Sequence, residues 1–296
     1  MTALPIALIN LENGLHEQGF AFDDPFARIF TDVDEPPALI LVNEATQWWA
    51  GGGRGGYRAA SALRRRYGTP YAIEIGWCDR SDHPPALIYD PTRLEMTWWG
   101  DERSIPNLSR RNVAELRTGT GRELRVVLQH WHPKDGDTRL KEARHISWTV
   151  EGPPTLLGGD LNGTGSGPHW PEKDWPATPP HKRHHKGWQP GGPGTAWTRD
   201  TRAVDHLIGT WSPDGGRVDG CGFHALAELD WRHRGADPAD QLVPTTNTRA
   251  EHGGSQAIDL LLVNDPELFV PGSYRVHIPA GLLDTDHRLV TATIGL

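Results

Sequence analysis

Cysteine is scarce in this chain, which has two in 296 residues. Cys78 and Cys221 cannot build the disulfide framework of a small secreted scaffold, and a reducing compartment is the simplest interpretation. They also cannot form a zinc site, because structural zinc needs four ligands at short, regular spacing.

Long hydrophobic runs are also missing. The longest, such as Ala38–Val42, are far shorter than the roughly 20 residues of a membrane-spanning helix. The apolar segment Ala3–Leu11 contains Asn10, and no Lys or Arg precedes Arg28, which does not fit a signal peptide. We therefore expect a cytoplasmic protein without a membrane partner, and nothing indicates an obligate protein partner.

Positive charge is in deficit. Lys and Arg number 30 against 38 Asp and Glu, which gives a formal charge of −8. Such a balance argues against a protein whose whole surface binds nucleic acid, although it leaves room for local basic patches. A site rich in carboxylates would itself add to the negative count.

Glycine, proline and tryptophan are abundant instead. The chain has 34 Gly, 25 Pro and 13 Trp, against 6 Phe. The first two residue types imply many turns, and the indole rings serve either as core or as stacking platforms. The residues from 163 to 201 concentrate this composition, with His181, His184 and His185 in the middle, and they lack periodicity. So long an aperiodic stretch is typical of a functional or mobile loop.

Polar residues of catalytic type stand where apolar strands end. In layered α/β proteins, strand ends are where sites are assembled. The residues in such positions are Asn10, Glu44, His130, Asp160 with Asn162, and Asp286 with His287, while Asp259 lies inside an apolar strand. The pattern predicts that they form one site.

The segment Thr155–Asn162 is central to this prediction. Apolar residues lead into Gly-Gly-Asp-Leu-Asn, so Asp160 and Asn162 occupy alternate positions and point the same way if the strand continues. The pair offers a proton acceptor and a neutral hydrogen-bond donor to an anion.

Taken in order, these motifs resemble those of the endonuclease/exonuclease/phosphatase superfamily, the DNase-I-like metal-dependent phosphodiesterases. Any one motif is weak, but six in family order over nearly the whole chain are a strong signal. They are Leu-Ile-Asn-Leu-Glu-Asn around Asn10, Leu-Val-Asn-Glu ending at Glu44, Val-Val-Leu-Gln-His ending at His130, Gly-Asp-Leu-Asn at 159–162, Ala-Ile-Asp-Leu-Leu-Leu around Asp259, and Thr-Asp-His at 285–287.

The departures from the family pattern are small. Leu161 replaces a frequent Phe, Thr285 a frequent Ser, and Asn43 the Gln that often precedes the glutamate. His132 rivals His130, and we favour His130 because it ends a strand. The 163–201 segment is the least family-like part of the chain.

The resemblance implies one domain over residues 1–296, with a Pro/Gly/Trp/His-rich loop insertion at about 163–201. The implied fold is a four-layer α/β/β/α sandwich of two stacked, mostly antiparallel sheets. It also implies hydrolysis of a phosphodiester with Mg²⁺ or Mn²⁺, most simply of DNA or RNA.

The resemblance further assigns roles. Glu44 would bind the cation, with Asn10 and Asp286 contributing directly or through water. His287, oriented by Asp259, would act on the attacking side of the phosphate. The remaining expected roles are a water-orienting or deprotonating Asp160, an Asn162 that donates to a phosphoryl oxygen, and a His130 that donates to the phosphate. Whether Asp160 or His287 takes the proton stays open.

Some residues outside the six motifs could also contact a substrate or a metal. Arg110 and Arg111 are adjacent, so in a strand only one of them would face a substrate phosphate. We expect residues 51–56 to form a flexible glycine-rich connection around Arg54, since they lack the Lys-Ser/Thr ending of a phosphate-binding loop. The histidines of the 163–201 segment favour a solvated loop over a metal site. Its tryptophans and cations could contact a single strand.

Two other functions remain open. The same scaffold serves phosphatases and phosphodiesterases of small molecules or lipid head groups, and the acidic charge favours this alternative. The second alternative is a binding module without catalytic activity. The presence of every expected catalytic residue argues against it.

Overall fold

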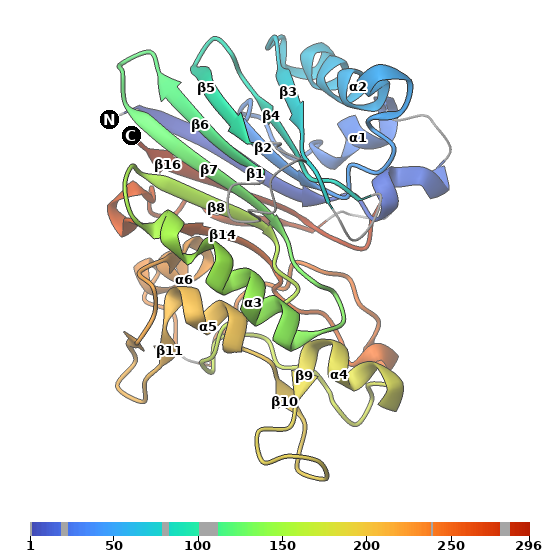
Figure 1. The fold of residues 1–296 in the computed structure, drawn as a ribbon, viewed down its shortest axis with the longest axis vertical. Helices are drawn as coiled ribbons and strands as arrows, with labels where there is room; N and C mark the ends of the chain where they lie inside the picture. Colours follow the sequence, from blue (N-terminus) through green and yellow to red (C-terminus); the bar gives the residue numbers. More distant parts are fainter. Residues whose placement is uncertain (1, 19–22, 79–82, 101–111, 238, 279–284) are drawn as a thin grey trace.

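The computed structural model describes residues 2–18, 23–78, 83–100, 112–237, 239–278 and 285–296. Two six-stranded sheets stack face to face, and helices cover the outer face of each (Figure 1). The prediction of a four-layer α/β/β/α sandwich is confirmed.

The first sheet has the strand order β15-β16-β1-β2-β4-β3. Its central pair β1/β2 is parallel, and the other neighbouring strands are antiparallel. The strands are β15 (Arg275–His277), β16 (Leu289–Gly295), β1 (Ala3–Asn10), β2 (Leu39–Asn43), β4 (Ala86–Tyr89) and β3 (Ala72–Ile75).

The second sheet has the order β13-β14-β8-β7-β6-β5, again with one parallel pair, β7/β8, among antiparallel neighbours. Both sheets are therefore mostly antiparallel, as expected. The strands are β13 (His224–Ala225), β14 (Asp259–Val263), β8 (Thr155–Asp160), β7 (Glu123–His130), β6 (Val113–Thr118) and β5 (Leu94–Gly100).

Burial on both faces explains the continuous apolar runs of the central strands. In β1, Leu4, Ile6 and Leu8 enter the core between the sheets. Ala7 and Ile9 point the opposite way, into the core under the first helical layer. Alternate side chains of one strand thus serve two hydrophobic cores.

Among the helices of the described ranges, two lie on the first sheet and three on the second. The first layer is α1 (Asp23–Ile29) and α2 (Ala50–Tyr67), and the second is α3 (Gly136–Ile146), α5 (Arg202–Ile208) and α6 (Leu226–His233). The Asp135 carboxylate caps α3 by accepting the Asp137 N–H. None of the helices in the described ranges has the length and hydrophobicity that a transmembrane segment needs.

The expected flexible glycine connection is wrong for its second half. Gly51, Gly52 and Gly53 have left-handed backbones, but Gly55 and Gly56 lie inside α2 and are buried. A Cβ on Gly55 would come within 2.9 Å of the Trp48 backbone. These glycines therefore allow α2 to pack closely, which is a role that composition alone does not reveal.

The 163–201 segment is also more ordered than its sequence predicts. It contains a helical turn, α4 (Arg183–Lys186), and a short ribbon of β9 (Gly187–Trp188) and β10 (Thr198–Arg199). Trp170 is fully buried beneath the second helical layer. Elements of two to four residues are too short for periodicity to detect.

Contacts between the two sheets bring together the strand ends that carry the polar residues. The Asn43 side chain, from β2, accepts the Asp160 N–H at 2.6 Å and donates to the Gln129 carbonyl at 2.9 Å. A Cβ on Gly159 would lie 3.2 Å from Asn43 Oδ1 across the sheets and 1.7 Å from the oxygen of Gln129 in the neighbouring strand β7, so glycine permits both close approaches.

Candidate active site

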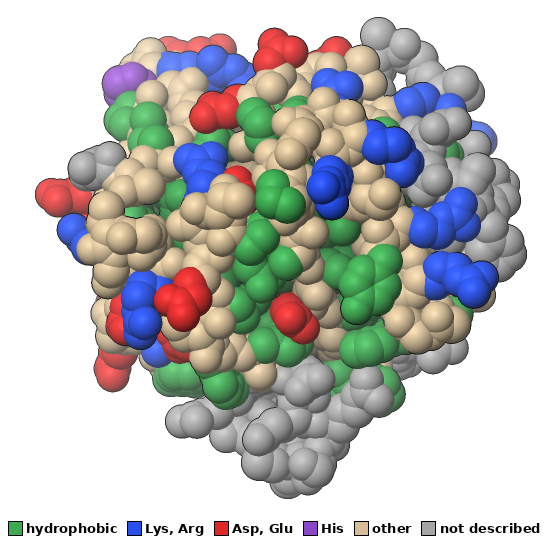
Figure 2. Space-filling view, turned by 90° about the horizontal axis from the view of Figure 1, so that it is seen from above, with side chains coloured by type: hydrophobic (Ala, Val, Ile, Leu, Met, Phe, Trp, Pro, Cys, Tyr) green, Lys and Arg blue, Asp and Glu red, His purple; other side chains and the backbone are tan. Residues whose placement is uncertain are grey.

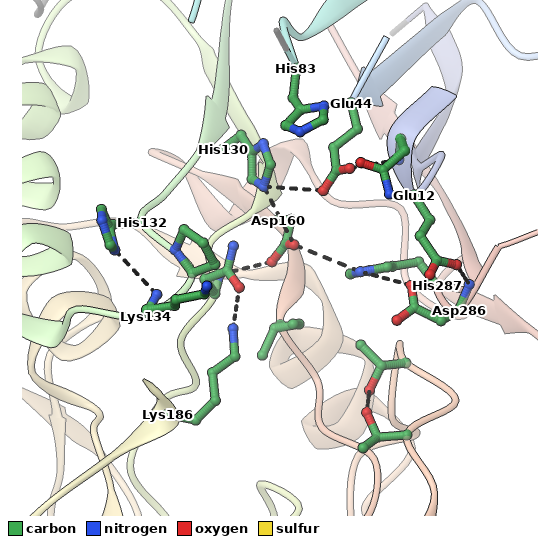
Figure 3. A pocket seen from close by; sticks show the side chains of 16 residues that line it. Glu12, Glu44, His83, His130, His132, Lys134, Asp160, Lys186, Asp286 and His287 are labelled. Atoms are coloured by element: carbon green, nitrogen blue, oxygen red, sulfur yellow. Dashed lines mark hydrogen bonds and ion pairs between the residues drawn. The ribbon is translucent and has the colours of Figure 1, made fainter. Parts of the chain in front are cut away.

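The polar residues predicted from strand ends meet at one edge of the sandwich. The parallel pairs β1/β2 and β7/β8 both end there, while β14 and β16 begin there. The first sheet contributes Asn10, Glu44, Asp286 and His287, and the second contributes His130, Asp160, Asn162 and Asp259. Figure 3 shows Glu44, His130, Asp160, Asp286 and His287 around the pocket.

Asn10 links the two sheets at the centre of the site. Its side-chain NH₂ group donates to Glu44 Oε1 at 3.3 Å and to Asp160 Oδ2 at 3.1 Å. Its side-chain oxygen Oδ1 accepts the Glu12 N–H at 3.0 Å. In this orientation, Asn10 holds two carboxylates close to each other.

Glu44 follows β2 with a left-handed backbone, at φ 55°. This conformation is uncommon for a residue other than glycine and costs about 1–3 kcal/mol. The Asn13 N–H donates to Glu44 Oε2 at 2.7 Å, which helps to fix the side chain. The Glu44 carboxylate lies 3.7 Å from His130 Nε2, across the boundary between the sheets.

Asp259 and His287 form a buried pair. His287 Nδ1 lies 2.8 and 3.0 Å from the two oxygens of Asp259. Burial works to lower the pKa of His287, but Asp259, with Asp160 and Asp286, outweighs burial and raises it to about 10. The imidazole is therefore held as a cation, with Nδ1–H donating to Asp259.

Asp160 lies between two imidazoles. Its Oδ2 is 3.8 Å from His287 Nε2 and 3.8 Å from His130 Nε2. Burial works to raise the pKa of Asp160, but His287, Lys186 and His130 outweigh it, so the pKa is lowered and the carboxylate is ionised. The Asn162 N–H donates to its other oxygen at 2.9 Å.

Asn162 is engaged on both sides of its amide. Its Nδ2 donates to the Trp131 carbonyl at 3.0 Å, and its Oδ1 accepts from Lys186 Nζ. Like Glu44, it has a left-handed backbone, at φ 50°. Its side chain is therefore fixed between the loop after β7 and Lys186.

Comparison with solved structures identifies this architecture. D. rerio TDP2 complexed with a single-strand DNA product matches with a TM-score of 0.57 and 13% identity over 100% of both chains. The fold is that of the endonuclease/exonuclease/phosphatase superfamily. ANGEL2, a 2′,3′-cyclic phosphatase, matches with a TM-score of 0.54 and 11% identity over 99% of this chain and 95% of its own.

A bacterial protein shares the superfamily fold as well. The endonuclease/exonuclease/phosphatase family protein from Bacteroides thetaiotaomicron has a TM-score of 0.51 and 12% identity, over 99% of this chain and 97% of its own. No protein-family model matches the sequence, and no curated protein matches it. At such identities the likeness establishes the fold.

A pocket of about 750 Å³ opens over the candidate site. Besides the predicted residues, its lining includes Glu12, His83 and Lys134, which sequence reasoning did not select. It also includes Lys186, one of the cations of the 163–201 segment that the sequence suggested for substrate contact. Glu12 stood within a recognised motif, whereas His83 and Lys134 had no signal in the sequence.

Two donor sets in the pocket could hold a cation. Asp160, Asp259 and His287 each offer a ligand atom, all within 4.8 Å of one another. The hydrogen bond between His287 and Asp259 already occupies two of these groups, so we favour the other set, centred on Glu44. Its carboxylate converges with Asp160 on the Asn10 amide, and hard oxygen donors suit Mg²⁺ and Mn²⁺.

The remaining predicted residues lie further from this centre or outside it. The Asp286 side chain is 56% exposed, with Oδ1 3.5 Å from His287 Nε2. His132 lines the pocket beside His130, but only His130 lies near both carboxylates. Arg110 and Arg111 lie outside the described residues.

Proposed function

We propose that the protein is a divalent-metal-dependent phosphodiester hydrolase acting on DNA or RNA. The observation that carries the proposal is the ionised Asp160 between two imidazoles, 3.8 Å from each, beside Glu44 in an open pocket. A phosphoryl transfer site needs an acceptor for the water proton and positive charge for the non-bridging oxygens.

The residues divide these tasks. Asp160 orients the attacking water and accepts its hydrogen, because His287 already carries a proton. The His287 cation, fixed by Asp259, stabilises negative charge that builds on the phosphate. His130, which faces Glu44 and Asp160, donates a hydrogen bond to another phosphoryl oxygen.

Glu44 would hold the cation, assisted by Asn10, with Asp286 at the pocket rim. A divalent ion there would neutralise charge on the phosphate. The Asn10 amide keeps the Glu44 and Asp160 carboxylates close despite their mutual repulsion.

A nucleic-acid substrate is favoured by the solved TDP2 complex, which holds a single-strand DNA product. ANGEL2, described as a 2′,3′-cyclic phosphatase, favours a small phosphorylated substrate as the second candidate. On the face seen in Figure 2, Lys and Arg gather toward the right, while Asp and Glu lie mainly at the top and left, with hydrophobic side chains between them.

A substrate panel tests the proposal. Purified protein with Mg²⁺ or Mn²⁺ is incubated with labelled single-stranded DNA, RNA, plasmid and inositol phosphates. We expect cleavage of a nucleic acid that stops with a chelator and falls at least about 100-fold in Glu44→Gln. The exposed Glu35→Gln is the matched control and should retain activity.

Two other outcomes of this experiment would favour the alternative functions. Release of phosphate from inositol phosphates alone would transfer the assignment to the second candidate. Absence of turnover on every substrate, together with no rise in melting temperature on adding Mn²⁺, would indicate a silent binding module.

A further inference from the structure

Lys186 reaches the pocket from the part of the chain that is least family-like. It is the last residue of α4, within the 163–201 segment, and its side chain lines the pocket. Its Nζ donates to Asn162 Oδ1, on the side of Asp160 opposite Glu44 (Figure 3). A cation therefore stands where the resemblance predicted only the neutral Asn162 amide.

The surrounding contacts fix the backbone on both sides of Lys186. The buried Arg139 of α3 donates from Nη1 to the carbonyls of His132 at 3.0 Å and His185 at 2.9 Å. The Lys186 carbonyl itself accepts the Asp200 N–H at 2.9 Å. These bonds tie α4 to the loop that follows β7, which carries His130.

Asp200 also links the segment around Lys186 to α3. Its carboxylate accepts from Arg202 at 2.8 and 2.9 Å and lies 3.6 Å from Arg139 Nη2. Arg202 also contacts Asp137 of α3 at 2.8 Å. The network of Arg139, Asp200 and Arg202 thus holds Lys186 in the pocket wall.

Among the described residues, the ammonium group of Lys186 lacks a negatively charged partner within hydrogen-bond distance. Within the described ranges, Lys186 Nζ has one hydrogen-bond acceptor, the neutral Asn162 amide, and no carboxylate in salt-bridge distance. An ammonium has three donors, and burying it without an anion is costly. Burial accordingly lowers the pKa of Lys186 to about 7, against the attraction of Asp160.

We propose that Lys186 binds a non-bridging oxygen of the substrate phosphate, on the side of Asp160 opposite Glu44. This inference rests on the proposed function, and it adds that the pocket recognises the phosphate group itself. The phosphate supplies the anion that Lys186 lacks within the protein. Lys186 and the Glu44 cation site then compensate its charge from two sides.

Binding of inorganic phosphate to the metal-free protein tests the assignment. With a chelator present, titration calorimetry compares wild type with Lys186→Met and Lys186→Arg. We expect Lys186→Met to weaken phosphate binding at least about tenfold and Lys186→Arg to retain much of it, because a charged contact is lost only in the former. Lys182→Met, on the same segment but exposed, is the matched control and should bind as wild type does.

Kinetics give a second readout. On the best substrate, Lys186→Met should lower kcat/KM at least about 30-fold, with part of the loss in KM, because the contact also exists in the ground state. Lys182→Met should leave both constants within about twofold. Unchanged phosphate affinity in Lys186→Met, or no phosphate binding by wild type, would overturn the proposal.

The two proposals can fail separately. If wild type hydrolyses no phosphoester but Lys186→Met still loses phosphate binding, the hydrolase assignment fails and the Lys186 site stands. If Lys186→Met does not fold, acetylation of the wild-type protein, followed by mass spectrometry, decides instead. Phosphate should slow acetylation of Lys186 and not of Lys182, and equal slowing of both would contradict the site.

Discussion

The protonation of His287 and of Asp160, at the pocket centre, is set by the charged side chains next to them. His287 is a cation because Asp259 lies 2.8 Å from its Nδ1, and Asp160 is ionised because His287 and His130 face it. Two of the neighbouring residues, Glu44 and Asn162, have left-handed backbones. Such strain persists only where the surroundings impose it, and it is concentrated at functional sites.

The Asp259–His287 pair gives a prediction at this scale. In Asp259→Asn, the amide cannot hold His287 as a cation, so kcat should fall about 100-fold while KM changes little. Steady-state kinetics on the best substrate measures both constants. The exposed Asp214→Asn removes the same charge and should behave as wild type. Wild-type kcat in Asp259→Asn would show that the pair is only structural.

At the scale of elements, the site exists because two parallel strand pairs end at the same edge of the sandwich. Gly159 in β8 and Asn43 in β2 set the approach of the sheets. In Gly159→Ala, the new Cβ would lie 1.7 Å from the Gln129 carbonyl oxygen, so the strands must separate. We expect a loss of at least about 3 kcal/mol of unfolding free energy, in the range of severe overpacking.

Urea unfolding measures this loss. Gly119→Ala is the control, because its Cβ would meet nothing within 4 Å. A Gly159→Ala protein as stable as wild type would mean that strands β7 and β8 do not depend on this close approach.

The sequence predicts those strands and helices well whose structure follows from a local pattern of apolar and polar residues. The apolar run Ala38–Val42 and the polar residue after it identified a buried strand and the site at its end. Contacts between distant residues leave no such pattern. Asn43 meets Asp160 across 117 positions, and Lys186 meets Asn162 from a four-residue helix, so neither role could be read from local sequence.

At the scale of the whole molecule, a buried ionic cluster fastens the chain after β8 to the second helical layer. Glu228 of α6 accepts from Arg217 at 2.8 Å and lies 3.6 Å from the fully buried His169. Burial works to raise the pKa of Glu228, but His169 and Arg217 outweigh it and lower the pKa to about 2.

This shift predicts how stability depends on pH. Because the folded pKa lies below the ordinary value of 4.5, the contribution is fully present above about pH 4.5 and is lost as the pH falls through about 2. It amounts to about 3 kcal/mol, at about 1.36 kcal/mol per pKa unit. Glu228→Gln should therefore be less stable near neutral pH and should lose less stability on acidification than wild type.

Urea unfolding across this pH range compares the two proteins. The exposed Glu267→Gln is the control and should follow the wild-type curve. Parallel curves for wild type and Glu228→Gln would contradict the assigned role of the cluster.

The central claim is that Asp160 acts on the water that attacks phosphorus. The most direct measurement compares initial rates of single-stranded DNA cleavage by wild type and Asp160→Asn with saturating Mg²⁺, after equal melting temperatures have confirmed folding. We expect Asp160→Asn to cleave about 10³-fold or more slowly than wild type, because the amide cannot accept the proton. Cleavage by Asp160→Asn at close to the wild-type rate would contradict it.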